Sequence, residues 1–166
     1  MHRLILLVLA VAQTACAPQT PVISTAYRLA AAPIYSSATL DEARLIGQWA
    51  QVGAYGAPGC DDGAAEISGA VGALGIAYRL CVSGKRIAAS GPLTRTGPGR
   101  FTAPGLPGDL WLLWMDADAR TLVFGTPSGA YGFVLNRGGA MPPDRARAAR
   151  EIFDWNGYDP AALSLW

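Results

Sequence analysis

The sequence predicts an all-β domain, an eight-stranded antiparallel up-and-down barrel followed by one C-terminal α-helix. Its 166 residues suit one domain with a core of its own. Its 20 Gly and 12 Pro follow no fixed period, which is typical of short elements joined by tight turns. Between residues 47 and 137, short apolar and aromatic runs recur between Gly, Pro and Asp clusters. The links are too short for parallel crossovers, so the strands are expected to be antiparallel.

Residues 1–16 are predicted to be a signal peptide. His2 and Arg3 precede an apolar run over residues 4–12, which as a helix reaches about 14 Å, half of a hydrocarbon core. The run ends in small residues before Cys16 and resembles a bacterial lipobox, in which the cysteine is acylated. An ordinary cleavage site over residues 15–17 is the alternative, and it leaves no lipid. We expect an exported protein, lipid-anchored at Cys16 on the periplasmic face of the outer membrane, or otherwise soluble in the periplasm.

The mature chain is expected to begin with a flexible tether over residues 17–39, which are rich in Ala, Pro, Ser and Thr. The folded domain then covers residues 40–166. Asp41 to Leu45 are expected to form one helical turn, capped by Thr39 or Asp41.

Turn residues divide the following segment into the expected strands. We expect strands near residues 48–55, 64–70, 75–82, 85–92, 99–103, 110–116, 120–125 and 130–137. Closing this sheet into a small barrel leaves no exposed edge strand. A helical period follows over residues 143–156, beginning at Pro142-Pro143 and ending at Asn156-Gly157. We expect Ile152 and Phe153 to cover the outside of the barrel.

Several short motifs then coincide in one order. Gly47-Gln48-Trp49 opens the first strand, Asp116 to Arg120 separate two later strands, Leu135-Asn136-Arg137 ends the last strand, and Gly157-Tyr158-Asp159 follows the helix. Together they resemble the lipocalin family, most closely the bacterial outer-membrane lipocalins related to apolipoprotein D, over roughly residues 40–165. The resemblance implies a cup with Trp49 at its closed base and Arg137 across the indole, so that Gly47, Trp49 and Arg137 are structural residues. Ala119 stands where the family usually has tyrosine, and residues 56–105 match poorly.

The resemblance implies that the cup binds a small hydrophobic ligand. We expect a fatty acid or lysophospholipid, bound or carried in membrane maintenance. The candidate lining residues are Tyr55, Trp111, Leu113, Phe124, Tyr131 and Phe133. The polar head needs a partner near the rim, and the candidates are Arg79, Lys85, Arg86, Arg95 and Arg100.

The sequence argues against several other functions. The single histidine, His2, lies in the expected signal peptide, so we expect no catalytic triad, no metal site and no cofactor. Haem ligated by tyrosine or methionine is the alternative that the composition leaves open. Nucleophile-elbow and nucleotide-loop motifs are lacking, and no catalytic residue is assigned. With 13 basic and 12 acidic residues, nucleic acid is not an expected partner.

Cys60 and Cys81 are expected to form a disulfide, because the first and third strands of a meander run the same way. Two free buried cysteines are the alternative. A different class of protein also has a small barrel, an early G-x-W-like segment and one disulfide: the periplasmic inhibitors of secreted metalloproteases. In that alternative the segment 17–39 acts as the inhibitory segment.

Overall fold

The computed structural model describes residues 26–138 and 140–166. The predicted signal peptide, Cys16 and the first part of the predicted tether lie outside the described residues. The strands are β1 (Gly47–Tyr55), β2 (Ala64–Ala70), β3 (Ala73–Val82), β4 (Lys85–Pro92), β5 (Thr94–Gly97), β6 (Arg100–Thr102), β7 (Leu110–Met115), β8 (Thr121–Gly125), β9 (Gly132–Asn136) and β10 (Leu163–Leu165). The helices are α1 (Pro143–Trp155) and the 3-10 turns η1 (Glu42–Leu45) and η2 (Pro160–Ala162).

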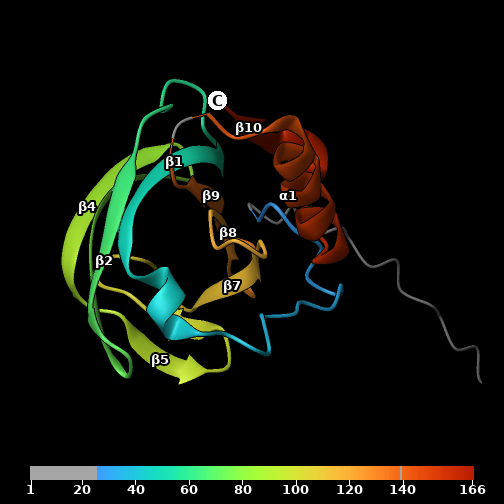
Figure 1. Ribbon diagram of the computed structural model, residues 1–166. Coiled ribbons are helices and arrows are strands. Elements are labelled where there is room, and N and C mark those ends of the chain that lie inside the picture. The colour runs from blue at the N-terminus through green and yellow to red at the C-terminus, as the bar shows by residue number, and fades with distance from the viewer. Residues whose placement is uncertain (1–25, 139) are drawn as a thin grey trace, which may run out of the picture.

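The strands form one antiparallel sheet that curls into a nearly closed up-and-down barrel, with α1 on one side (Figure 1). The order is β4-β3-β2-β1-β9-β8-β7-β6-β5, and β10 pairs with β1. The predicted fold class is therefore confirmed, and Asp41 caps η1 through the N–H of Ala43. No helix among the described residues is long and apolar enough to cross a bilayer.

The sheet path has nine strands where eight were expected, because a short strand, β5, follows β4 after Leu93. β4 pairs with β3, and β5 pairs with β6 on the other side of the opening in the sheet. The Leu93 N–H donates to the Leu74 carbonyl at 2.9 Å, which joins the break between β4 and β5 to the start of β3. Pro92 ends the first pairing because it has no N–H to donate.

The side-chain amide of Gln51 joins β1 to β3 just beyond Ala64, the first residue of β2. The Gln51 amide nitrogen donates to the Cys81 carbonyl at 2.8 Å, and its oxygen accepts from the Cys81 N–H at 2.7 Å. The chain between β1 and β2 folds over this region and is held by a disulfide between Cys60 and Cys81, whose Cα atoms are 5.7 Å apart. The predicted disulfide is confirmed.

Two apolar clusters stabilise the domain. The inner cluster fills the barrel and includes Leu80, Phe101 and Leu112. The outer cluster lies between the barrel wall and α1, where Ala149 and Phe153 are buried and Ile152 is partly buried. The helix therefore covers the barrel wall as expected, because β7 to β9 are apolar on both faces.

The segment 26–39 is attached to the domain, so the expectation of a flexible tether is wrong for this part of 17–39. Arg28 is buried, and its guanidinium donates to the carbonyls of Asn156 at 3.0 Å and Pro127 at 2.7 Å. The Ser37 N–H donates to the Leu112 carbonyl at 2.8 Å. The segment has no periodic pattern because it bonds to separate loops and strands one residue at a time.

Candidate functional site

One end of the barrel is closed by Trp49 and Arg137. The Trp49 indole is buried, and its N–H donates to the Leu45 carbonyl at 2.8 Å. The Arg137 guanidinium carbon lies 3.9 Å from the indole centroid, as the resemblance implies. It also donates to the carbonyls of Arg44 and Ile46, each at 2.8 Å. Burial and the neighbouring Arg44 charge lower the pKa of Arg137. These contacts make both residues structural.

The turn between β7 and β8 is also structural. An Asp116 carboxylate oxygen accepts the N–H groups of Arg120 at 2.6 Å and Thr121 at 2.5 Å. Ala119 adopts a left-handed conformation with φ of 51°, in the position where the family usually has tyrosine. Asp116 therefore holds a hairpin turn.

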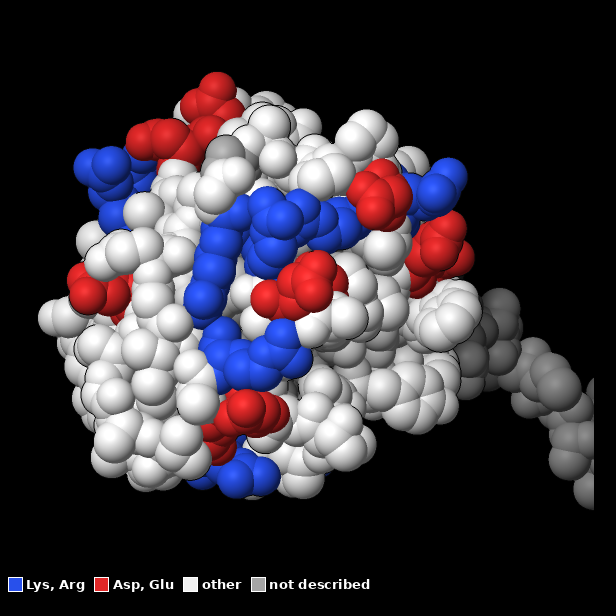
Figure 2. Space-filling model, in the orientation of Figure 1, with Lys and Arg blue, Asp and Glu red and all other residues white. Residues whose placement is uncertain are grey.

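Opposite charges are interleaved on the molecular face in Figure 2. Lys and Arg form a band across the middle of this face, with Asp and Glu among them. This face therefore has no extended field of one sign. Elsewhere in the domain, Arg95 pairs with the buried Glu42, with 3.3 Å between nitrogen and oxygen.

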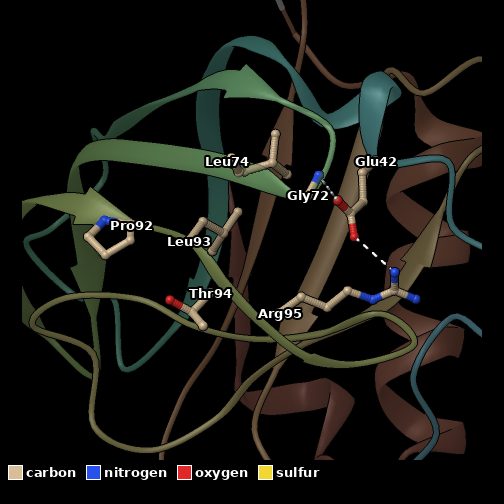
Figure 3. Close-up of a pocket in the computed structure, with 8 residues that line it drawn as sticks. Glu42, Gly72, Leu74, Pro92, Leu93, Thr94 and Arg95 are labelled. Carbon is tan, nitrogen blue, oxygen red and sulfur yellow. Dashed lines mark hydrogen bonds and ion pairs between the residues drawn. The ribbon is translucent and has the colours of Figure 1, made fainter.

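A small hollow of about 250 Å³ lies beside that ion pair (Figure 3). Glu42 is buried there, and its second carboxylate oxygen accepts the Gly72 N–H at 3.1 Å. The hollow is bordered by Leu74 and Leu93, at the break between β4 and β5. Glu42 thus ties η1 to the β2–β3 turn and to β5 across the opening in the sheet.

A larger hollow of about 680 Å³ lies at the mouth of the barrel, at the end away from Trp49. Its volume falls within the range of small-molecule sites, roughly 300–1,000 Å³. The residues that line it come from the chain entry before η1, the β3–β4 hairpin and the loops after β6 and β8. They are Ala26, Tyr27, Val82, Ser83, Lys85, Ile87, Gly105, Pro107, Ser128 and Ala130.

Lys85 is the cation that the fold brings to this mouth. Alternation along β4 puts Lys85 on the same strand face as Ile87 and Ala89, which pack against the inner cluster. Lys85 has no ion pair with any residue in the described ranges.

The four other candidate cations are engaged elsewhere. Arg79 and Arg86 pair with Asp62 at 3.7 and 2.5 Å, and the Arg86 guanidinium lowers the pKa of that carboxyl. Arg95 pairs with Glu42, and Arg100 stacks 4.0 Å from the Trp111 ring centroid. Lys85 is thus the head-group candidate that the structure favours.

The loop 103–109 lies over the barrel interior at the mouth. Leu106 is buried in the inner cluster. The Tyr78 hydroxyl donates to the Pro104 carbonyl, and the Tyr131 hydroxyl donates to the Asp109 carbonyl at 3.0 Å. Burial raises the pKa of both tyrosines. The loop at the mouth is therefore held near both ends by core tyrosines.

Three of the six predicted lining residues lie inside the barrel. Phe124, Tyr131 and Phe133 belong to the inner cluster, and the Phe133 ring lies 5.4 Å from Phe124 and 6.2 Å from Tyr131. Contact of these three with a ligand stays a prediction.

The other three lie outside, so their prediction as lining residues is corrected. Tyr55, Trp111 and Leu113 belong to the outer cluster or pack against it beneath α1. A bulge between Gln51 and Gly53 reverses the alternation along β1, which turns Tyr55 outward. β7 is apolar on both faces, so its sequence does not distinguish the inner face from the outer one.

Sequence reasoning missed Tyr78 and Leu106, the buried residues that hold the loop 103–109 at the mouth. Tyr78 had a readable signal, because Ile76, Tyr78 and Leu80 alternate along one face of β3 and all are buried inside the barrel. Leu106 had none, since its loop has the Gly and Pro composition of an ordinary turn.

Comparison with known proteins agrees with this geometry. A family model described as a lipocalin-like domain matches residues 98–166. The cockroach allergen Per a 4 superposes with a TM-score of 0.59 at 8% identity, over 81% of this chain and 92% of the allergen. Lobster apocrustacyanin A1 gives 0.57 at 12% identity, over 75% and 78% of the two chains. The siderocalin Ex-FABP gives 0.55 at 12% identity, over 74% and 93%.

No curated protein sequence matches the chain. The structural likenesses establish the fold, and the family match covers β6 to the C-terminus, the part that contains the Asp116 turn, Arg137 and α1. Residues 98–166 are therefore similar in sequence to a lipocalin-like domain, and the whole barrel has the fold of the superposed proteins.

Proposed function

We propose that this protein binds, and carries without chemical conversion, a small amphiphile with an apolar chain and an anionic head. A fatty acid or a lysophospholipid has this chemistry. The observation that carries the proposal is the position of Lys85 at a 680 Å³ mouth above an apolar barrel interior.

The two parts of the site suit the two parts of such a ligand. Each methylene that leaves water contributes about 0.8 kcal/mol, so an acyl chain supplies most of the affinity. A carboxylate or phosphate at the mouth gains a charge-assisted hydrogen bond from Lys85, flanked by the hydroxyls of Ser83 and Ser128. The lipocalin fold supports binding of a small hydrophobic molecule, and the siderocalin Ex-FABP is described as having dual ligand specificities.

Export and anchoring complete the proposal. The disulfide between Cys60 and Cys81 favours an oxidising compartment. Acylation of Cys16 would hold the domain at the periplasmic face of the outer membrane, where it would exchange lipids in membrane maintenance, as in the outer-membrane lipocalins that it resembles. The metalloprotease-inhibitor alternative is less favoured, because residues 26–39 bond to the barrel and are not an extended free segment.

The test separates the head group from the chain. Binding of dodecanoic acid and of dodecanol to the delipidated full chain is measured by displacement of a fluorescent fatty acid. We expect Lys85→Gln to weaken the acid roughly 3–10-fold, the size of one partly exposed charged contact, and to leave the alcohol unchanged. Arg86→Gln, whose native side chain pairs with Asp62 outside the mouth, is the matched control and should leave both affinities unchanged.

Three outcomes would contradict the proposal. Equal losses for acid and alcohol would show that Lys85 acts on the fold. Equal losses for both lysine and arginine variants would show a general charge effect. Binding of neither ligand, together with inhibition of a secreted metalloprotease, would support the alternative function.

A further inference from the structure

Three large apolar side chains are exposed together around the C-terminal end of α1. Trp155 is 75% exposed, Leu29 is 73% exposed and Tyr35 is 64% exposed. The Leu29 N–H donates to the Gly157 carbonyl at 2.8 Å, and the Tyr35 N–H donates to the Asn156 side-chain oxygen at 2.7 Å. Leu29 and Tyr35 are thus held beside Gly157 and Asn156, the two residues that follow Trp155. We call these three residues the aromatic patch.

A shallow apolar groove extends the aromatic patch along α1. It has a volume of about 90 Å³ and is lined by Trp114, Ile152 and Trp155, with Ala148 and Glu151 at its edge. Large apolar side chains that are exposed near one another are costly in water, and such clusters mark sites of interaction. Trp and Tyr are the side chains that favour the boundary between lipid head groups and acyl chains.

The aromatic patch lies at the same end of the domain as the mouth. Arg28 joins them, since its guanidinium donates to the carbonyl of Asn156 and to that of Pro127, next to the mouth residue Ser128. The Tyr27 N–H also donates to Gly129 at 2.8 Å, and the Asp159 N–H donates to the Tyr27 carbonyl at 2.9 Å. A surface that engages the aromatic patch is therefore close to the mouth as well.

A lipid anchor at Cys16 would hold this end of the domain near a membrane, because the chain between Cys16 and Ala26 is short. Ala26 is ten residues after Cys16, so the intervening chain spans at most about 35 Å. That distance is close to the length of the barrel itself, because a nine-residue strand is about 30 Å long. A lipid on Cys16 therefore keeps the point where the chain enters the domain, three residues before Leu29, within reach of the bilayer surface.

We infer that the aromatic patch is a membrane-docking surface that seats the mouth of the barrel against the head-group region of a lipid bilayer. The inference rests on the proposed anchor at Cys16 for its orientation. Glu151 and Asp154 are exposed beside Trp155, so the attraction comes from aromatic insertion and not from anionic lipids. The partner is thus a zwitterionic bilayer, and docking shortens the path of a lipid between the membrane and the barrel.

Tryptophan quenching tests the inference on the full processed chain in phosphatidylcholine vesicles. The phosphatidylcholine is brominated near the top of its acyl chains, where it quenches indoles inserted at that depth. We expect Trp emission to fall on these vesicles, and Trp155→Phe to abolish most of the fall. Trp166→Phe is the matched control and should keep it, because Trp166 is 37% exposed and its indole N–H bonds to the Gln51 carbonyl. Replacing part of the phosphatidylcholine by phosphatidylglycerol should not increase the quenching.

A second preparation separates this inference from the anchor. A Cys16→Ser chain with an N-terminal hexahistidine tag on nickel-chelating lipid supplies the tether without acylation. Quenching that depends on Trp155 in this preparation supports the docking surface even if Cys16 carries no lipid. Tethered protein without Trp155-dependent quenching overturns the inference and leaves ligand binding untouched. A dimer in solution that Trp155→Ser dissociates would also overturn it, because the occupant would then be a second copy of the chain.

Discussion

Arg137 lies 3.9 Å over the ring of Trp49 and bonds to the carbonyls of Arg44 and Ile46, so one side chain joins β9, β1 and η1. The pair closes one end of the barrel, and the hollow that contains Lys85 lies at the other. The molecule therefore has one closed end and one mouth, and the predictions below separate their roles.

Replacement of Trp49 by alanine should destabilise the domain by about 3–5 kcal/mol, because it empties the closed end and leaves Arg137 without its ring. Urea unfolding followed by circular dichroism measures the loss. Trp155→Ala is the matched control, since Trp155 is exposed, and should change the unfolding free energy by less than about 0.5 kcal/mol. Equal effects of the two substitutions would contradict the structural role of Trp49.

Removal of the disulfide by the double substitution Cys60→Ala and Cys81→Ala should cost roughly 3 kcal/mol, the chain-entropy value for a loop of this length. The loop that the disulfide holds lies beside the mouth hairpin, where Gly56 approaches Gly84. Ligand binding should therefore weaken under conditions in which the barrel is still folded. Peptide mapping without reduction checks the bond itself. Alkylation of both thiols in unreduced protein would show that the bond is absent.

Three buried tyrosines should make the fold sensitive to alkali. Burial raises the pKa of Tyr55 and Tyr131 well above the ordinary value and that of Tyr158 to about 12. Below pH 10 these tyrosines are protonated in both the folded and the unfolded state, so they do not lower the free energy of unfolding. As pH rises toward 12, the unfolded chain releases protons that the folded state keeps, so stability falls.

The free energy of unfolding should fall by about 4 kcal/mol per pH unit in this range, or by about 1.4 kcal/mol for each tyrosine. Urea midpoints at stepped pH measure it. Tyr158→Phe should reduce the slope by about one third, after allowing for the hydrogen bond that its hydroxyl accepts from the Thr126 N–H.

Shortening of Leu106 to alanine should speed entry into the barrel, because this side chain anchors the loop 103–109 in the inner cluster. Each 1 kcal/mol removed from loop closure raises the open population about fivefold. Stopped-flow mixing with a fluorescent fatty acid should therefore show a faster association rate. Val71→Ala, on the distant β2–β3 turn, should leave the rate unchanged, and an unchanged rate for Leu106→Ala would argue against entry at this loop.

Cys16 should be acylated after removal of the signal peptide. Radiolabelled palmitate should enter the wild-type protein and not the Cys16→Ser variant in the native host. Equal labelling of both proteins, or of neither, would refute the anchor while leaving the ligand site and the barrel unaffected.

Local signals were sufficient for most of the architecture. Apolar and aromatic runs with Gly, Pro and Asp between them predicted every strand from β1 to β9 except β5, and the apolar stripe of Ile152 and Phe153 predicted which side of α1 packs on the wall. These elements are readable because turn chemistry and alternation depend on neighbouring residues. The pairing of Cys60 with Cys81 was also readable, since the direction of strands in a meander follows from their order.

The sequence by itself determined the barrel and its helix, and its strand order predicted the disulfide. The pairing of Trp49 with Arg137 followed from the resemblance to the lipocalins. Only the tertiary structure decided which side of each strand faces inward, because a bulge in β1 reverses its alternation and β7 is apolar on both sides. It also decided that Lys85, and not one of four arginines, reaches the mouth. A cation's location depends on which carboxylate or ring lies opposite it, and those partners are distant in the chain: Glu42 for Arg95 and Asp62 for Arg79.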